Sequence, residues 1–155
     1  WAEGFNAKSE SLLLLGRTGL GKTHLSVAMA RAVAMAGYGV VYSSAQRMMD
    51  ALEAEKFSRD PKAEGAADIF LNCDLLALDD LGTEFSTQFT AAALFNVINT
   101  RLTEGRPTVV NTNLEPVEIE AKYSQRMVSR LICGYRVLRF AGKDIRFIRK
   151  KEAAG

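Results

Sequence analysis

The chain is 155 residues long, with 48% hydrophobic and 25% charged residues and a formal net charge of +2. These values fit one soluble globular domain with a core of its own and exclude a disordered chain, and no apolar run approaches the roughly 18 residues of a membrane-spanning helix. We therefore expect a cytoplasmic protein without a membrane partner, in which Cys73 and Cys133 are reduced thiols.

Hydrophobic periodicity and turn residues predict strands that alternate with helices along the chain. A lead-in that carries Trp1 and Phe5, which we expect to pack on the core, precedes the first strand. The predicted strands are residues 11–15, 40–42, 75–78, 108–110 and 136–140, with a last extended piece at 145–148. The predicted helices are residues 22–36, 44–57, 63–71, 87–102, 116–122 and 125–132. Such alternation indicates a three-layer α/β fold built on a parallel sheet.

The loop between the first strand and the first helix matches G-x-x-x-x-G-K-[ST], the phosphate-binding pattern of nucleoside-triphosphate enzymes. It consists of Gly16, Arg17, Thr18, Gly19, Leu20, Gly21, Lys22 and Thr23, and His24 follows in the first helical turn. The glycines allow backbone N–H groups to converge on phosphate oxygens. Lys22 can reach the β- and γ-phosphates, and the Thr23 hydroxyl can ligate Mg²⁺. We therefore predict that residues 16–24 bind a nucleotide, with His24 in a packing or hydrogen-bonding role rather than a catalytic one.

Two adjacent carboxylates, Asp79 and Asp80, follow the buried strand at 75–78. Ligands bind at the carboxyl ends of strands in open α/β sheets. Asp79 is therefore predicted to hold Mg²⁺ opposite Thr23, and Asp80 to orient and partly deprotonate the attacking water. An alternative for paired aspartates after a strand is a turn or a helix cap.

The fourth predicted strand ends in Asn111, Thr112 and Asn113. Period-two geometry places the two asparagines on the same face of the sheet. An amide at this end can hold the attacking water or the γ-phosphate, although asparagine in a turn after a strand is also common.

Charge is distributed unevenly despite the small net value. Residues 126–151 contain nine basic residues against Asp144 alone, whereas residues 50–84 contain ten acidic and three basic residues. A basic end can serve an anionic partner, such as a nucleic acid or an acidic surface, or it can be a solvated face without a partner.

The segments GRTGLGKTHL, LLALDDLG, VVNTNL and YSQRMVSRL occur in this order. They resemble the AAA+ ATPase domain of the bacterial helicase loaders DnaC and DnaI, and they are equally similar to IstB, a transposition helper ATPase. The resemblance covers almost the whole chain. It implies a three-layer P-loop NTPase fold of the AAA+ (ASCE) type with a five-stranded parallel sheet, ATP and Mg²⁺ as ligands, and Mg²⁺-dependent ATP hydrolysis.

The resemblance also implies roles for individual residues. Residues 16–23 correspond to the Walker A loop, and Asp79 with Asp80 corresponds to Walker B. Asn113 corresponds to sensor 1, with Asn111 as the alternative.

Two arginines near residue 130 complete the implied site. Arg130 falls where the family places its arginine finger, and Arg126, one helical turn earlier on the same face, is the second candidate. An exposed helix charge without a role is the alternative for either arginine.

Partners are implied as well. An arginine finger acts in the site of a neighbouring subunit, so the resemblance implies self-association in trans. It further implies a replicative helicase or a transposase, and single-stranded DNA bound through basic groups. The insertion after the second strand usually contacts DNA in this family, but here it is acidic overall, and its basic candidates are Arg47, Lys56, Arg59 and Lys62.

The chain departs from the family pattern in three respects. Many AAA+ proteins carry Glu where Asp80 stands. Because residues 1–155 end soon after the fifth predicted strand, we expect them to contain no helical lid of the kind that carries sensor 2, and Arg146 is the remaining candidate for that role. We also expect the family's N-terminal partner-binding region to lie outside residues 1–155. We therefore expect residues 1–155 to form a single AAA+ domain, the C-terminal domain of a longer loader protein.

The leading hypothesis is an oligomeric AAA+ ATPase that loads a replicative helicase in DNA replication. The alternatives are an IstB-like ATPase that assists DNA transposition, a small-molecule P-loop kinase, and a module that binds ATP without hydrolysing it. The chain shows no Arg-rich lid of the kinase type, and Asn72-Cys73-Asp74 lacks the Asn-Lys-x-Asp guanine reader of GTPases.

Overall fold

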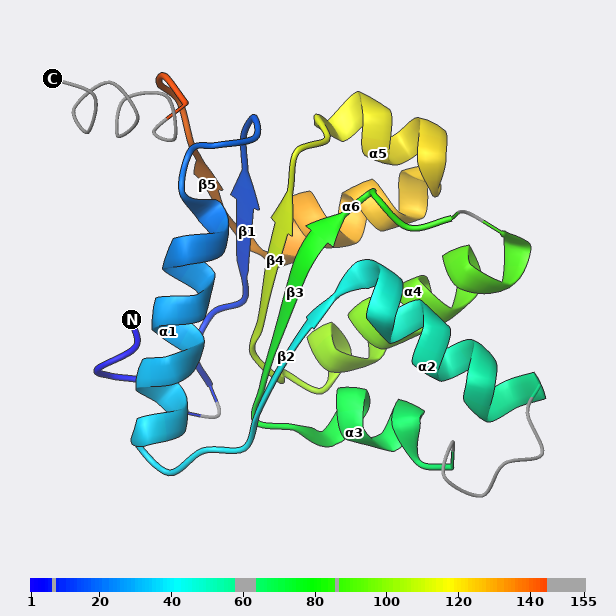
Figure 1. The fold of residues 1–155 in the computed structure, drawn as a ribbon, viewed down its shortest axis with the longest axis horizontal. Helices are drawn as coiled ribbons and strands as arrows, with labels where there is room; N and C mark the ends of the chain where they lie inside the picture. The colour runs from blue at the N-terminus through cyan, green and yellow to red at the C-terminus, as the bar shows by residue number, and fades with distance from the viewer. Residues whose placement is uncertain (7, 58–63, 86, 145–155) are drawn as a thin grey trace, which may run out of the picture.

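A computed structural model of the chain describes residues 1–6, 8–57, 64–85 and 87–144. Its centre is a sheet of five parallel strands in the order β2-β3-β4-β1-β5 (Figure 1). The strands are β1 (Leu12–Leu15), β2 (Val40–Ser44), β3 (Leu75–Leu81), β4 (Thr108–Thr112) and β5 (Arg136–Arg139). The helices are α1 (Lys22–Met35), α2 (Ala45–Phe57), α3 (Ala66–Asn72), α4 (Gln88–Thr103), α5 (Pro116–Lys122) and α6 (Gln125–Gly134). The predicted five-stranded parallel sheet is confirmed.

Alternating side chains of the strands build a separate core on each face of the sheet. In β1, Leu12 and Leu14 belong to the core under α1, whereas Leu13 and Leu15 belong to the larger core under the remaining helices. Among the helices of the described residues, α1 alone lies on its side of the sheet (Figure 1). A strand buried on both faces needs an uninterrupted apolar run, which is why β1 consists of four leucines.

Strands β3 and β4 continue further than their apolar residues predict. The ladder between them is irregular, because Leu78 pairs with Val110 but Leu81 pairs with Thr112. Asp80 lies in this irregularity with a left-handed backbone, at φ 52°. Consequently Asp79 points into the protein, whereas the side chain of Asp80 is exposed.

Two helix starts show how the acidic insertion after β2 is organised. Ser44 ends β2 and also accepts a hydrogen bond from the Arg47 N–H at 3.3 Å, which begins α2. The carboxylate of Glu55 accepts from the N–H groups of Gly65 and Ala67, each at 2.8 Å, so α2 caps α3. The predicted break at 59–62 lies outside the described residues, as do residues 145–148.

The lead-in packs on the core as predicted. Phe5 is buried under α1 with its ring edge-on to Tyr38, and Trp1 covers Phe5. Cys73 and Cys133 are free thiols. Within the described ranges, no helix has the length and apolarity to cross a membrane.

Candidate functional site

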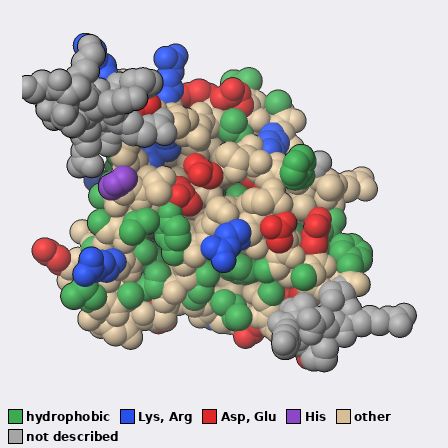
Figure 2. All heavy atoms as spheres, in the orientation of Figure 1, with side chains coloured by type: hydrophobic (Ala, Val, Ile, Leu, Met, Phe, Trp, Pro, Cys, Tyr) green, Lys and Arg blue, Asp and Glu red, His purple; other side chains and the backbone are tan. Residues whose placement is uncertain are grey.

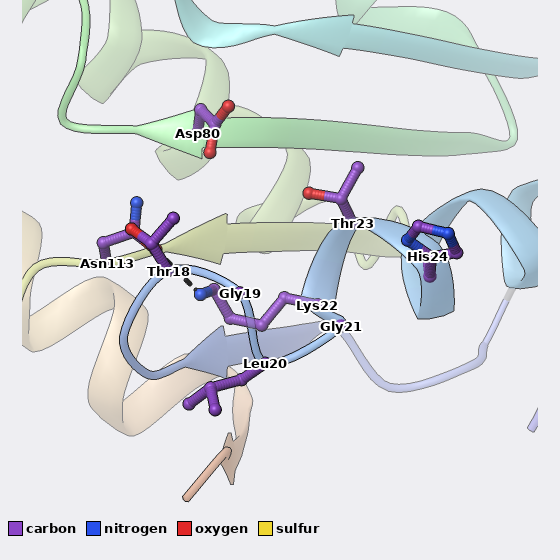
Figure 3. Close-up of a pocket in the computed structure, with 9 residues that line it drawn as sticks. All are labelled: Thr18, Gly19, Leu20, Gly21, Lys22, Thr23, His24, Asp80 and Asn113. Carbon is purple, nitrogen blue, oxygen red and sulfur yellow. Dashed lines mark hydrogen bonds between the residues drawn. The ribbon is translucent and has the colours of Figure 1, made fainter. Parts of the chain in front are cut away.

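A cavity of about 290 Å³ lies at the carboxyl ends of β1, β3 and β4, where the loop after β1 leads into α1. Figure 3 shows Lys22 reaching toward Asn113 from one side of this space, with Thr23 and Asp80 facing it and Leu20 pointing away. The cavity is lined by Thr18, Gly19, Leu20, Gly21, Lys22, Thr23, His24, Asp80 and Asn113. All nine of these residues are among the sequence-predicted candidates for nucleotide contact or catalysis.

The loop around this cavity requires glycine at two positions for reasons of space as well as backbone conformation. Gly16 has φ 150°, and a Cβ there would lie 2.5 Å from the carbonyl oxygen of Phe140. Gly19 has φ 82°, and a Cβ there would collide with the carboxylate of Asp144. The segment that follows β5 therefore lies directly against the loop.

Lys22 is almost completely buried, with 6% of its surface exposed. Its Nζ donates to the carbonyl oxygens of Gly16 at 2.5 Å and Arg17 at 2.9 Å, and to Oδ1 of Asn113 at 2.8 Å. Burial lowers the pKa of Lys22, whereas the carboxylates of Asp80 and Asp79 raise it. The ammonium group is thus held inside the loop by acceptors that phosphate oxygens can replace.

The carboxylate of Asp79 is the most heavily hydrogen-bonded group near the cavity. Its Oδ1 accepts from Thr23 Oγ1 at 3.2 Å, from Asn111 Nδ2 at 2.6 Å and from the Asp80 N–H at 3.1 Å. Its Oδ2 accepts from the hydroxyl of Tyr42 at 2.5 Å. These donors come from β2, β3, β4 and α1, so the carboxylate joins three strands to the helix that follows the loop.

The arrangement of Thr23 and Asp79 fits a magnesium ion. A hydroxyl and a carboxylate 3.2 Å apart present the oxygen ligands that Mg²⁺ prefers. In the described part of the chain, no group of three or more His, Cys, Asp or Glu residues could hold a metal. The protein would therefore supply few ligands and leave the others to phosphate oxygens and water, as is usual for Mg²⁺.

Asp80 occupies a different environment from its neighbour. Its side chain is exposed at the mouth of the cavity, yet the surrounding loop removes part of its hydration. This desolvation raises the pKa of Asp80, the Asp79 carboxylate raises it further, and Lys22 opposes both. A carboxylate with a raised pKa is a better proton acceptor than a free one.

Asn111 lies in β4 and Asn113 directly follows it, and of the two only Asn113 lines the cavity. Asn113 contacts Lys22 there. Asn111, two residues earlier in the chain, is buried, and its Nδ2 donates to Ser26 Oγ at 2.8 Å and to Asp79. Of the two sensor 1 candidates, Asn113 alone therefore has access to a ligand.

The basic candidates lie away from this cavity. Arg126 and Arg130 are exposed on α6 and do not line the cavity of their own chain. In the insertion after β2, Arg47 is exposed, and Lys56 has its Nζ 4.5 Å from the centre of the Phe89 ring. Figure 2 shows acidic and basic side chains interspersed on the face it draws. Arg59, Lys62 and Arg146 lie outside the described residues.

Sequence reasoning missed two residues beside the cavity, Tyr42 and Ser26. Ser26 lies three residues after Thr23 in α1, so helical periodicity could have placed it toward the sheet. Tyr42 offered no comparable signal, because its contact with Asp79 depends on β2 lying next to β3.

The chain matches the family model described as "IstB-like ATP binding protein" over residues 3–153. It is 23% identical over 134 residues to the replicative helicase loader DnaC of Escherichia coli (strain K12), which covers 86% of this chain and 55% of the relative. The chain thus spans about half the length of this curated relative.

Two solved structures share the fold. A crystal structure of the DnaC helicase loader matches with a TM-score of 0.79 and 22% identity, over 90% of this chain and 84% of the other. The replication initiator DnaA, bound to AMPPCP and single-stranded DNA, matches with a TM-score of 0.78 and 25% identity, over 99% of this chain and 48% of the other.

The raised pKa of Asp80 predicts a stability effect for Asp80→Asn. A raised pKa in the folded state means that the folded protein binds more protons than the unfolded chain, so stability falls as pH rises above the ordinary value of 3.8. The asparagine variant avoids this loss. It should be more stable than the wild type near neutral pH, by less than about 1 kcal/mol because the group is exposed.

Urea unfolding at several pH values checks this effect. The two midpoints should converge as the pH falls below 3.8, where the carboxyl is neutral in both states. A wild-type protein that is the more stable of the two near neutral pH would contradict the assignment.

Proposed function

Since this chain belongs to the family of IstB-like ATP-binding proteins, we propose that it hydrolyses ATP in a magnesium-dependent reaction. The observation that carries the proposal is the meeting of Lys22, Thr23, Asp80 and Asn113 around one cavity at the end of the phosphate-binding loop. For the AAA+ ATP-binding domain we thus propose a reaction, the hydrolysis of ATP, in addition to the binding of ATP.

Binding of the triphosphate rests on the loop and on Lys22. The backbone N–H groups of residues 16–21 and the positive end of the α1 dipole attract phosphate oxygens. Lys22 exchanges its present acceptors for oxygens of the β- and γ-phosphates. Because its ammonium is already buried, the contact is made in a place where charge is weakly screened.

Thr23 and Asp79 would hold the magnesium ion, which would supply positive charge to neutralise the phosphate oxygens. Asp80 orients a water molecule for attack on the γ-phosphorus and accepts its proton as the bond to the β–γ bridging oxygen breaks, and ADP and phosphate are released. Asn113 holds the water or a γ-phosphate oxygen by an amide hydrogen bond, since its side chain faces the cavity beside Lys22.

We infer that Arg130 completes the site of a neighbouring subunit. Its exposure on α6 leaves it accessible to a second copy, and it lines no part of its own chain's cavity. A guanidinium supplied in trans would neutralise charge on the γ-phosphate as it is transferred. Arg126, one turn earlier, is the alternative donor. Self-association would then be part of the mechanism.

As its biological role we propose the loading of a replicative helicase in DNA replication, with single-stranded DNA as a second ligand. Support comes from the likeness to the DnaC loader over most of this chain and from a structural relative bound to single-stranded DNA. The second candidate is assistance to DNA transposition, which the IstB-like family match favours. In either case residues 1–155 would be one domain of a longer cytoplasmic protein.

ATP hydrolysis by the full-length protein tests the reaction. Turnover should require Mg²⁺ and rise with single-stranded DNA. Lys22→Ala should lower kcat/KM for ATP by at least about 100-fold, because a donor to the transition-state charge is lost. Lys8→Ala, at an exposed position in the lead-in, is the matched control and should behave as wild type. Unchanged turnover in Lys22→Ala would remove the proposed role of this loop.

Mixing two inactive variants tests whether Arg130 acts as an arginine finger in the site of a neighbouring subunit. Arg130→Ala should bind ATP normally and lose about 10³-fold in kcat, since a finger acts on the transition state. Adding Asp80→Asn protein should restore part of the turnover, because one of the two mixed interface arrangements joins the intact Asp80 of the Arg130→Ala subunit to the intact Arg130 of its neighbour. The exposed Arg31→Ala serves as the control. Failure of the mixture to recover activity would rule out action in trans.

Size-exclusion chromatography of the full-length protein separates the two biological roles. With ATP and Mg²⁺ present, the protein should co-migrate with the replicative helicase of its source organism and not with an IS21-type transposase. Co-migration with the transposase alone would favour the transposition role instead.

A further inference from the structure

Tyr42 reaches the carboxylate of Asp79 from the neighbouring strand. In the register of β2 and β3, Tyr42 pairs with Ala77 and Ser44 pairs with Asp79, so the tyrosine lies two residues before the level of the aspartate. Both side chains are on the face covered by α1, because residues two apart in a strand share a face. The small side chain of Ala77 leaves room for the tyrosine to extend along the sheet. Its hydroxyl ends 2.5 Å from Oδ2 of Asp79.

The side chain of Tyr42 contributes little buried surface to the core. It is 41% exposed, whereas Phe5, in the core on the same face, is 6% exposed. The closest specific contact of Tyr42 is therefore the hydrogen bond at the tip of its side chain. A phenylalanine in this position would bury the same carbon atoms and lose only the contacts of the hydroxyl, which are those with Asp79 and Ser26.

The two carboxylate oxygens of Asp79 accept different numbers of hydrogen bonds. Oδ1 faces Thr23, Asn111 and the Asp80 N–H, while the hydroxyl of Tyr42 approaches Oδ2. Rotation of an aspartate about its Cβ–Cγ bond is only weakly restricted by its own geometry, so hydrogen bonds decide its orientation. By holding Oδ2, Tyr42 keeps Oδ1 turned toward Thr23, the other predicted magnesium ligand.

We propose that Tyr42 is a positioning residue that orients Asp79 for magnesium, an assignment that rests on the proposed function. It acts through Asp79 and does not line the cavity beside the phosphate-binding loop. Its loss should therefore weaken the magnesium-dependent part of nucleotide binding and spare the part that needs no metal. Partners of this kind around a metal ligand are worth about 10- to 100-fold in metal affinity.

Nucleotide-binding titrations of the full-length protein and its Tyr42→Phe variant test this proposal without relying on turnover. The affinity for ATP in EDTA should be the same for both proteins. The Mg²⁺ concentration that gives half-maximal tightening of ATP binding should rise about 10-fold in the variant. Tyr38→Phe is the matched control: Tyr38 packs against Phe5 at the opposite end of the sheet and should leave both quantities unchanged. Thermal melting of each variant verifies that it is folded.

A second pair of variants asks whether Tyr42 acts through Asp79. In an Asp79→Asn background, adding Tyr42→Phe should change the Mg²⁺ requirement no further, because the shared contact is already lost. Additive losses would overturn the proposal, as would an equal loss of ATP affinity in EDTA.

The titrations also keep the two proposals apart. If wild-type protein bound ATP with no dependence on Mg²⁺, the proposed function would fail first. If wild type showed the dependence and Tyr42→Phe showed it unchanged, only the assignment of Tyr42 would be wrong.

Discussion

The structure depends on keeping one buried carboxylate satisfied. Asp79 is only 7% exposed, and a charge in such a place is costly unless hydrogen-bond donors surround it. The donors are Tyr42 of β2, Asn111 of β4 and Thr23 of α1, together with the adjacent backbone N–H. Three strands and the first helix are thereby held in register at the one point where a magnesium ion would bind.

A second buried carboxylate ties the site to the helices behind it. Glu84 is 3% exposed and accepts from the Gly82 N–H at 3.0 Å and from the Tyr123 hydroxyl, with Lys122 Nζ at 3.4 Å. This cluster joins the loop after Asp80 to the end of α5, immediately before α6. The water-positioning candidate and the helix that carries the proposed finger are thus connected through a short, well-paired set of contacts.

The domain therefore separates ligand capture from chemistry. We assign ligand capture to the loop whose glycines fit closely against the segment after β5, and to Lys22, whose present hydrogen-bond acceptors phosphate oxygens could replace. We assign the proposed chemistry to Asp80. The irregularity in the ladder between β3 and β4 turns its side chain away from the buried residues that precede it in β3 and toward the cavity. Such a division would allow a partner or a second subunit to control the proposed hydrolysis without blocking ATP binding.

Local patterns in the sequence were sufficient for the sheet, most helix limits and the phosphate-binding loop, because apolar periodicity and glycine placement act within a few residues. They also placed Asp79 and Asp80 at a strand end. Only the tertiary structure decided the order of the strands and the turning of Asp80 away from Asp79. The role of Tyr42 belongs to the same class. These features depend on register between strands distant in sequence, which local periodicity does not encode.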